Sequence, residues 1–454
     1  MIYNIDMSRR FFAFIAVLAS FTGLWALDFT GLTHSAVEIR PEMSSGLEAV
    51  YVLSGDDASA RIVYTATGDR VVWSRFSTLG GAYAEEIPVR HDGGKRWSVP
   101  FAGEDMGYII DDGTTRHCFW VVDYSCHRFD VRALTAAPAE DCGRTLIGVD
   151  GDAAPIPYYS VTGRRMELSR ELRLGYTTLT FDNDAFAYSP AVVERELAGI
   201  SGSAAIESPL CDTSFRLEGD RFLRQWGSPV SVESEYYATT AVDAETRVES
   251  NRTVADNEQT SGDSGDGSLG GSAPCEVHFE AAVTDAAIFT EWQISHSPEF
   301  DILENSFPEL AFDYTFTESG TTYVRFVANN SAGDCEYTGT TYEVTIGESR
   351  LEIPNAFSPE SSPGVNDLWK VSYKSLVSFE CHIFNRWGKC LFSTTDPAEG
   401  WDGKSGGKFV GSGVYYYVIK AVGADGIRYD RAGDINIINF KSGGTAAGDT
   451  ETEQ

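Results

Sequence analysis

Positive charge is scarce in this chain of 454 residues. Lys and Arg number 35 against 67 Asp and Glu, and the formal net charge at pH 7 is −32. Such an excess of carboxylates repels nucleic acid and anionic membrane surfaces, so we expect neither as a partner. The same excess favours solubility and attracts divalent cations, but it specifies no fold.

Long hydrophobic runs are absent beyond residue 26, so we expect no transmembrane segment in the mature chain. The one apolar run, Phe11–Leu24, follows Arg9 and Arg10 and precedes small residues near Ala26. This order is typical of a secretory signal peptide, here residues 1–26. Met7 is an alternative start to Met1. The run is short for a span of about 20 residues, which favours cleavage and export over a retained membrane anchor.

Metal-binding motifs are also lacking. The seven His are scattered and no C-x-x-C knuckle occurs. His117-Cys118 and Cys126-His127 flank a hairpin-sized segment, but ligands along one strand point to alternating faces, so a disulfide is favoured over zinc. No acidic cluster completes an EF-hand loop, so we expect solvated loops and no cofactor, with loop-bound calcium as the open alternative. The clusters are Asp111-Asp112, Asp150/Asp152, Asp182/Asp184 and Asp263/Asp266.

Eight cysteines are present, and in an exported chain an even number indicates disulfides. Sequence alone does not fix their connectivity. Because each neighbouring pair falls within one expected domain, we predict pairs within domains. They are Cys118–Cys126, Cys142–Cys211, Cys275–Cys335 and Cys381–Cys390.

Short runs with alternating apolar residues, separated by Gly and Asp turns, recur after the signal peptide. This period of two predicts an all-β chain of tandem immunoglobulin-like sandwiches rather than α/β alternation. Residues 28–137 form the first expected sandwich and residues 138–235 the second, in which Ala191–Leu197 is a candidate short helix. Residues 236–273 contain SGDSGDGSLGGS and predict a flexible acidic linker.

Strand patterns return over residues 274–349, with Trp292 in an early-middle strand. These features predict an immunoglobulin-like sandwich. The stretch FDYTFTESGTTYVRFVANNSAGDCEYT is similar to bacterial polycystic-kidney-disease-type (PKD-like) modules. That resemblance implies a spacer or adhesive unit of a surface protein.

Residues 351–441 predict a further small β-sandwich. Asn385-Arg386-Trp387-Gly388 lies between two strand patterns and suits a turn with left-handed positions. Gly413–Val422 is a continuous β-branched and aromatic run, as expected of a central strand. A polar tail, residues 442–454, follows.

The order of motifs in this segment closely resembles the gliding motility-associated C-terminal domain, the type B sorting domain of the type IX secretion system of Bacteroidetes. The matching elements are I-P-N-A-F-S-P, V-N-D, I-F-N-R-W-G, G-W-D-G, G-V-Y-Y-Y-V-I and I-N-I-I. The resemblance implies passage through the inner membrane by the signal peptide and recognition of this domain by the type IX machinery at the outer membrane. The residues that carry it are Pro354, Asn355, Phe357, Asn366, Asp367, Asn385, Arg386, Trp387, Gly388, Trp401, Asp402, Gly403, Gly413, Tyr415 and Tyr416.

The chain departs from the family pattern in three places. Glu360–Gly364 replaces the usual Asn-Gly-Asp-Gly loop, Cys381 and Cys390 are additional, and the polar tail follows the last strand.

Two further patterns bear on function. Gly403–Gly407 matches the G-x-S-x-G elbow of serine hydrolases, but no His follows His382 and the context is a β turn, so we expect no catalysis.

Aromatic residues before residue 238 could form a glycan-binding surface, although core packing is the default interpretation; they are Trp97, Trp120, Tyr158-Tyr159, Trp226 and Tyr236-Tyr237. We therefore expect a structural or adhesive protein, cell-surface or secreted, that contacts the type IX machinery and other surface proteins or glycans. The alternative is a glycan-binding or glycan-degrading surface component.

Overall fold

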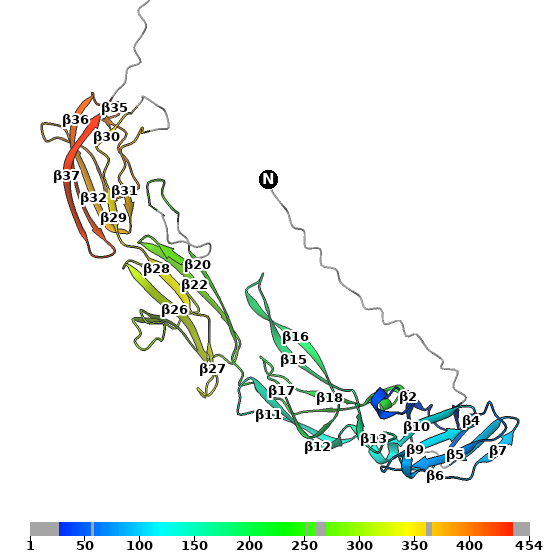
Figure 1. The fold of residues 1–454 in the computed structure, drawn as a ribbon. Coiled ribbons are helices and arrows are strands. Elements are labelled where there is room, and N and C mark those ends of the chain that lie inside the picture. The colour runs from blue at the N-terminus through cyan, green and yellow to red at the C-terminus, as the bar shows by residue number, and fades with distance from the viewer. Residues whose placement is uncertain (1–26, 56–58, 251–252, 260–268, 360–365, 439–454) are drawn as a thin grey trace, which may run out of the picture.

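The structure is a computed structural model that describes residues 27–55, 59–250, 253–259, 269–359 and 366–438. The expected signal peptide, the polar tail, the loop Glu360–Gly364 and the pair Asp263/Asp266 lie outside these ranges. Within them, no helix is long and apolar enough to cross a membrane. Figure 1 shows four β-sheet modules that follow one another along the chain. The prediction of an all-β chain of tandem sandwiches is confirmed.

The first module packs a four-stranded sheet, in the order β1-β4-β8-β7, against a six-stranded sheet, in the order β2-β3-β10-β9-β5-β6. Its inner side chains include Trp73, Tyr108 and Phe119, all nearly inaccessible. The strands are β1 (Leu27–Thr30), β2 (Val37–Ile39), β3 (Ala49–Leu53), β4 (Arg61–Thr65), β5 (Val72–Phe76), β6 (Glu85–Glu86), β7 (Arg90–Gly93), β8 (Arg96–Pro100), β9 (Met106–Asp111) and β10 (Arg116–Asp123). Three 3₁₀ turns accompany them: η1 (Met43–Ser45), η2 (Gly81–Tyr83) and η3 (Tyr124–His127).

The second module begins earlier than predicted. The strand at residues 130–138 pairs with residues 144–153, so the boundary at residue 137 is wrong. The helix predicted at Ala191–Leu197 is also wrong, because this segment pairs residue for residue with the preceding strand over a long hairpin. The elements are β11 (Asp130–Pro138), β12 (Arg144–Ala153), β13 (Ile156–Tyr159), β14 (Arg165–Leu168), β15 (Leu172–Asp182), β16 (Ala187–Leu197), β17 (Ile200–Glu207), β18 (Arg216–Gly219), α1 (Arg221–Gln225) and β19 (Val230–Glu233).

The third module includes parts of the predicted linker. Residues 244–250 pair with β22 and residues 269–271 pair with β28, so a flexible linker over 236–273 is wrong for these segments. The module has one sheet in the order β20-β22-β25 and a second in the order β21-β28-β26-β23-β24, and Trp292 and Phe326 lie in the core between them. The strands are β20 (Ala244–Ser250), β21 (Leu269–Gly271), β22 (Cys275–Val283), β23 (Phe289–Ser295), β24 (Asn305–Phe307), β25 (Ala311–Phe316), β26 (Gly320–Asn329), β27 (Glu336–Thr338) and β28 (Tyr342–Ile346).

The fourth module has a five-stranded sheet in the order β30-β37-β36-β32-β33, with β36 at its centre as its aromatic run predicts. One face of this sheet covers a core that includes Trp369, Trp401 and Ile419. The strands are β29 (Arg350–Glu352), β30 (Ala356–Phe357), β31 (Ser372–Lys374), β32 (Leu376–Phe384), β33 (Cys390–Thr394), β34 (Lys404–Ser405), β35 (Lys408–Phe409), β36 (Gly413–Gly423) and β37 (Arg428–Ile437).

Candidate functional site

The first joint, between modules one and two, is a shared hydrophobic core. Trp120 and Val50 of the first module pack in one cluster with Ile156 of β13, Met166 of β14 and Phe222 of α1. Because these five side chains are almost completely inaccessible, separating the two modules would expose apolar surface to water. The two modules therefore form one packed unit.

A buried ion pair lies in the same joint. Arg170 donates to Asp220 at 2.7 Å, and the two side chains are 3% and 0% exposed. Asp220 also accepts from the Tyr124 hydroxyl at 2.9 Å and caps α1 through the amides of Phe222 and Leu223. Burial, together with the neighbouring Asp220 carboxylate, raises the pKa of Tyr124 well above its ordinary value. Asp220 thus accepts from four hydrogen-bond donors, which offset part of the cost of burying its charge.

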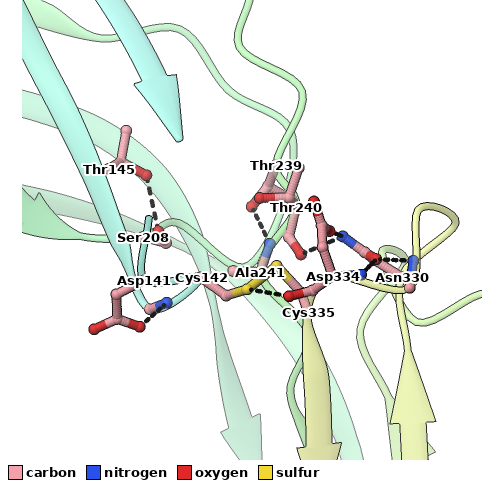
Figure 2. The surroundings of a disulfide bond; sticks show 12 residues. Asp141, Cys142, Thr145, Ser208, Thr239, Thr240, Ala241, Asn330, Asp334 and Cys335 are labelled. Atoms are coloured by element: carbon pink, nitrogen blue, oxygen red, sulfur yellow. Dashed lines mark hydrogen bonds between the residues drawn. A yellow bond between two sulfur atoms is a disulfide. The ribbon is translucent and has the colours of Figure 1, made fainter. Parts of the chain in front are cut away.

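The second joint is closed by a disulfide between modules two and three. Cys142, in the turn between β11 and β12, bonds to Cys335, which precedes β27, with the Cα atoms 5.6 Å apart (Figure 2). The connecting segment runs beside it, and the Thr239 hydroxyl donates to the carbonyl of Pro209 at 2.6 Å. The side-chain amide of Asn330 donates to the carbonyl of Thr240 at 3.4 Å (Figure 2). The joint is therefore held by one covalent bond and by its own linker.

This disulfide overturns part of the predicted connectivity. The pairs Cys142–Cys211 and Cys275–Cys335 are wrong, because Cys142 and Cys335 bond to each other across the joint. The remaining six cysteines are thiols in the structure, so the pairs Cys118–Cys126 and Cys381–Cys390 are not formed either. The β32–β33 register sets Cys381 opposite Thr394 and Cys390 opposite Phe384, so those two cysteines are not cross-strand neighbours. Burial raises the pKa of Cys381 to about 12.

The third joint, between modules three and four, is polar. The Ser349 amide and hydroxyl both donate to the carboxylate of Asp425 at 2.8 Å. Burial disfavours the charge on Asp425, but these hydrogen bonds hold its pKa below the usual value. Asn257, in the predicted linker, donates to the carbonyls of Val371 and Pro397, and Lys370 forms an ion pair with Asp256 at 2.7 Å. The segment around residue 257 thus docks on the fourth module.

Most of the motif residues of the fourth module have a structural role. Phe357 and Trp401 are buried, with ring centroids 5.5 Å apart. The carbonyl of Pro354 accepts from the Trp369 indole at 2.7 Å. The Tyr415 hydroxyl donates to the carbonyl of Gly411 at 2.8 Å.

The remaining core motif residues shape backbone turns. Asn355 accepts from Asn436 of the last strand, and Asn366 has a left-handed backbone with φ 55°. Asp402 bonds to the backbone amide and side chain of Lys404, which holds its pKa below the usual value in spite of its partial burial. Gly403, with φ 73°, leaves no free space for a side chain beside Phe357. Asp367 and Gly413 lie in the same module, and Gly413 begins β36.

Four other motif residues form an exposed turn at one end of the same module. Asn385 accepts from the amides of Trp387 and Lys389, both at 3.0 Å, and Gly388 has φ 79°. Trp387 is 78% exposed, and the guanidinium of Arg386 lies 4.9 Å from the centroid of its ring. Tyr416, on the nearby β36, is 46% exposed. The motif therefore has a buried part, which packing explains, and an exposed part, which packing does not explain.

The other sequence candidates are not brought together. His117 contacts Glu48 at 2.9 Å and His127 contacts Asp105 at 2.6 Å, and the described residues contain no group of three or more side chains placed to hold a metal. Ser405 lies in the two-residue strand β34 of a hairpin, without the strand-to-helix turn of a nucleophile elbow.

The acidic clusters have local partners. Asp112 is 3% exposed. It accepts from the amides of Thr114 and Thr115 and from the Tyr64 hydroxyl. Burial opposes the charge on Asp112, but these bonds and those from Thr67 hold its pKa well below the ordinary value. Asp150 pairs with Arg132 at 2.9 Å. The Asp152 and Asp182 carboxylates accept from backbone amides two residues on, as Asx turns do.

Among the candidate glycan-contacting aromatics before residue 238, Tyr236 is the most exposed at 71%. Trp120, Tyr158 and Tyr237 are buried, and the indole of Trp226 donates to the carbonyl of Ser35 at 3.0 Å. Tyr159 and Trp97 are partly buried. The default expectation of core packing is therefore correct for most of this set.

Sequence reasoning missed the groups that hold the joints. Arg170 and Asp220 stand apart in the sequence without a motif, although Asp220 before an amphipathic R-F-L-R-Q segment is a signal for the cap of α1. The pairing of Cys142 with Cys335 was not predicted, because we expected every disulfide to lie within one module.

Fold and sites define the chain as a tandem β-sandwich protein whose last module presents an exposed aromatic turn. Comparison with known families assigns two of the modules. Residues 351–436 match the family model of the CHU_C type IX secretion signal domain, and residues 135–234 match that of a fibronectin type III domain. The predicted sorting domain is thereby confirmed. No curated protein matches the chain.

Several solved structures are similar over long stretches. The tetra-tandem repeat in the extending region of a large adhesion protein is 10% identical, with 84% of this chain and 96% of that one covered and a TM-score of 0.20. A Ca²⁺-stabilised adhesin by which an Antarctic bacterium binds ice is 12% identical, with 91% and 99% covered and a TM-score of 0.17. The fibronectin(III)-like modules of Clostridium thermocellum CbhA are 12% identical, with 45% and 100% covered and a TM-score of 0.17.

Proposed function

We propose that this protein is exported by the type IX machinery and acts at the cell surface as a structural or adhesive protein without catalysis. The observation that carries the proposal is the C-terminal secretion signal domain at residues 351–436. Such a domain implies export to the cell surface or the extracellular space and contact with the secretion machinery. The first three modules are then the exported cargo, and export through the inner membrane rests on the predicted signal peptide.

The joints support a structural role for the cargo. A shared core, a disulfide and a docked segment connect each module to the next, so the modules do not hang on free linkers. A chain held in this way keeps its end modules apart, which suits a protein that extends from a surface. Absence of catalysis is supported by Ser405, which lies in a hairpin, and by His117 and His127, which contact single carboxylates.

The test is deletion of Leu351–Gln454 from the chain in its native bacterium. We expect the shortened protein to accumulate in the periplasm and the full chain to reach the surface, measured by protease accessibility on intact cells. Appearance of the shortened protein at the surface in normal amounts would refute the proposal.

A surface glycan-binding role is the second candidate. The exposed ring of Tyr236, beside a pocket of about 500 Å³ that also includes Asp212 and Ile288, is the observation that favours it. Binding of the full chain to a glycan array, lost in Tyr236→Ala and kept in the equally exposed Tyr83→Ala, would support this candidate. Turnover of a polysaccharide would instead indicate the glycan-degrading alternative.

A further inference from the structure

The exposed turn Asn385–Lys389 presents a tryptophan whose side chain lies outside the core of the module. Trp387 is 78% exposed, whereas Trp369 and Trp401 of the same module are buried in its core. A large aromatic side chain held in water gains nothing from packing. Exposed aromatic and Arg side chains are the residue types that contribute most to protein interfaces.

Hydrogen bonds within the turn fix the backbone that carries this side chain. Asn385 accepts from two amides of the turn, its own amide donates to the carbonyl of Lys389 at 3.0 Å, and Gly388 donates back to Asn385 at 2.9 Å. The Arg386 guanidinium lies over the Trp387 ring, a cation–π contact that orders both side chains. Binding of a partner here costs this chain little conformational entropy, because the turn is already formed.

An apolar surface continues from the turn. A groove of about 600 Å³ runs between residues 385–391 and the start of β36. Along β36 the outward side chains Val414, Tyr416 and Val418 are 46%, 46% and 38% exposed. Since β36 is the central strand of its sheet, these three side chains form an apolar stripe on the outer face of the module.

The charge of this surface is opposite to that of the chain. Among the described residues that line the groove, Arg386 and Lys389 are the charged ones, and none is a carboxylate. Two carboxylates of the neighbouring strands have partners within their own strands. Asp434, opposite Tyr416, accepts from Asn436 at 3.0 Å, and Glu380, opposite Lys420, contacts His382 at 2.8 Å. Residues 351–436 contain nine Lys and Arg and ten Asp and Glu, a net charge of −1, although the whole chain carries −32.

The surface is also turned away from the rest of the protein. Module three contacts module four through Ser349 and Ser319, which bond to Asp425 and Ala424 just beyond the far end of β36. The turn lies at the other end, where β36 begins at Gly413, and Figure 1 shows β35 and the start of β36 at this end of the module. A macromolecule can therefore reach the groove without meeting the cargo modules.

We propose that Trp387, Arg386 and the adjoining groove of β36 are the surface by which the secretion machinery recognises this protein. The partner is a protein of that machinery that presents an apolar pocket for the Trp387 ring, bordered by carboxylates that pair with Arg386 and Lys389. Charge complementarity favours this occupant. The cationic, aromatic surface attracts an acidic partner, and that partner repels the anionic cargo modules. The inference rests on the proposed export of the chain by its C-terminal domain.

The experiment measures surface display of full-length variants in the native bacterium. Trp387→Ala and the double variant Arg386→Glu with Lys389→Glu alter exposed side chains. Tyr83→Ala, 70% exposed in the first module, is the control for the loss of an aromatic ring. Arg428→Glu, exposed at the opposite end of the same sheet, is the control for charge reversal. We expect at least a tenfold loss of surface protein, with accumulation in the periplasm, for the two turn variants and normal display for both controls.

The outcomes separate this inference from the proposed function. Loss of display in the turn variants, with thermal unfolding of the purified proteins unchanged, supports the inference, and restored display in Trp387→Phe strengthens it. If deletion of residues 351–454 stops export but the turn variants are displayed normally, the inference fails and the proposed function stands. If the deletion variant is still displayed, the proposed function fails. The turn variants could instead be exported normally but lose self-association, or lose their retention by anionic surface polymers. Either result would show that this surface binds another partner and would overturn the inference.

Discussion

Among single residues, Asp220 connects several groups of the first joint. It is fully buried, balances the charge of Arg170, accepts from Tyr124 and caps α1. We predict that Asp220→Ala lowers the free energy of unfolding of the first two modules by about 3–5 kcal/mol, because it leaves the buried Arg170 charge without its counter-ion. The carbonyls of Ala154 and His127 still accept from Arg170, but they carry no net charge. Guanidinium unfolding of the full chain, followed by tryptophan fluorescence, measures this change.

The matched control is an exposed ion pair of the same type. Asp150 and Arg132 are 2.9 Å apart, and their side chains are 63% and 67% exposed. Because water solvates both charges, Asp150→Ala should cost at most about 1 kcal/mol. Equal losses in the two variants would contradict the role assigned to the buried pair.

Asp112 makes part of the stability depend on pH. Its pKa in the folded state is held well below the ordinary value, about 3.9 in an unfolded chain. Its contribution is therefore complete above the unfolded pKa and is lost as the pH falls towards the folded pKa. We predict that Asp112→Asn is less stable than the original chain at pH 7 and that the difference shrinks below about pH 4. Unfolding free energies measured from pH 7 to pH 3 test this, and a difference that grows on acidification would contradict it.

At the scale of the element, the turn after β11 is bonded to the turn before β27. We predict that a non-reducing peptide map of the secreted protein contains a linked pair Cys142–Cys335. We also predict that Cys142→Ser makes the connecting segment, residues 238–243, more sensitive to proteolysis, since the disulfide is the covalent restraint on that joint. Cys211→Ser is the control, because Cys211 is a thiol near the same joint. A linked pair Cys142–Cys211, or equal cleavage in both variants, would contradict the assignment.

Strands were predictable wherever a short run is rich in β-branched and aromatic residues. The segment Ala49–Leu53, five buried residues of a central strand, was read correctly, and so was the central run of β36. The strand β16 was not, because A-V-V-E-R-E-L also has the composition of a helix and only its pairing with β15 decides the outcome. The strand β20 was missed because it is an edge strand whose outward residues are polar, which resembles a linker in the sequence.

At the scale of the whole molecule, the sequence was most informative about the C-terminal module. Its motif residues fill a core around Trp401 or form tight turns, and both demands leave a clear pattern in the chain. The joints leave no such pattern in the sequence, because each depends on residues that are far apart in the chain, such as Cys142 and Cys335. The exposed turn at Trp387 was visible as a motif, but only the structure separates it from the buried motif residues.

Whether the last module alone directs export can be measured by transplanting it to another protein. Residues 349–454 are fused to a periplasmic reporter enzyme that carries its own signal peptide, and the fusion is produced in the native bacterium. The measurement is the fraction of reporter activity on the outside of intact cells or in the medium. We predict that most of the activity moves outside the cells. It should stay in the periplasm when the fused segment carries Trp387→Ala. Retention of the unaltered fusion in the periplasm would contradict the claim.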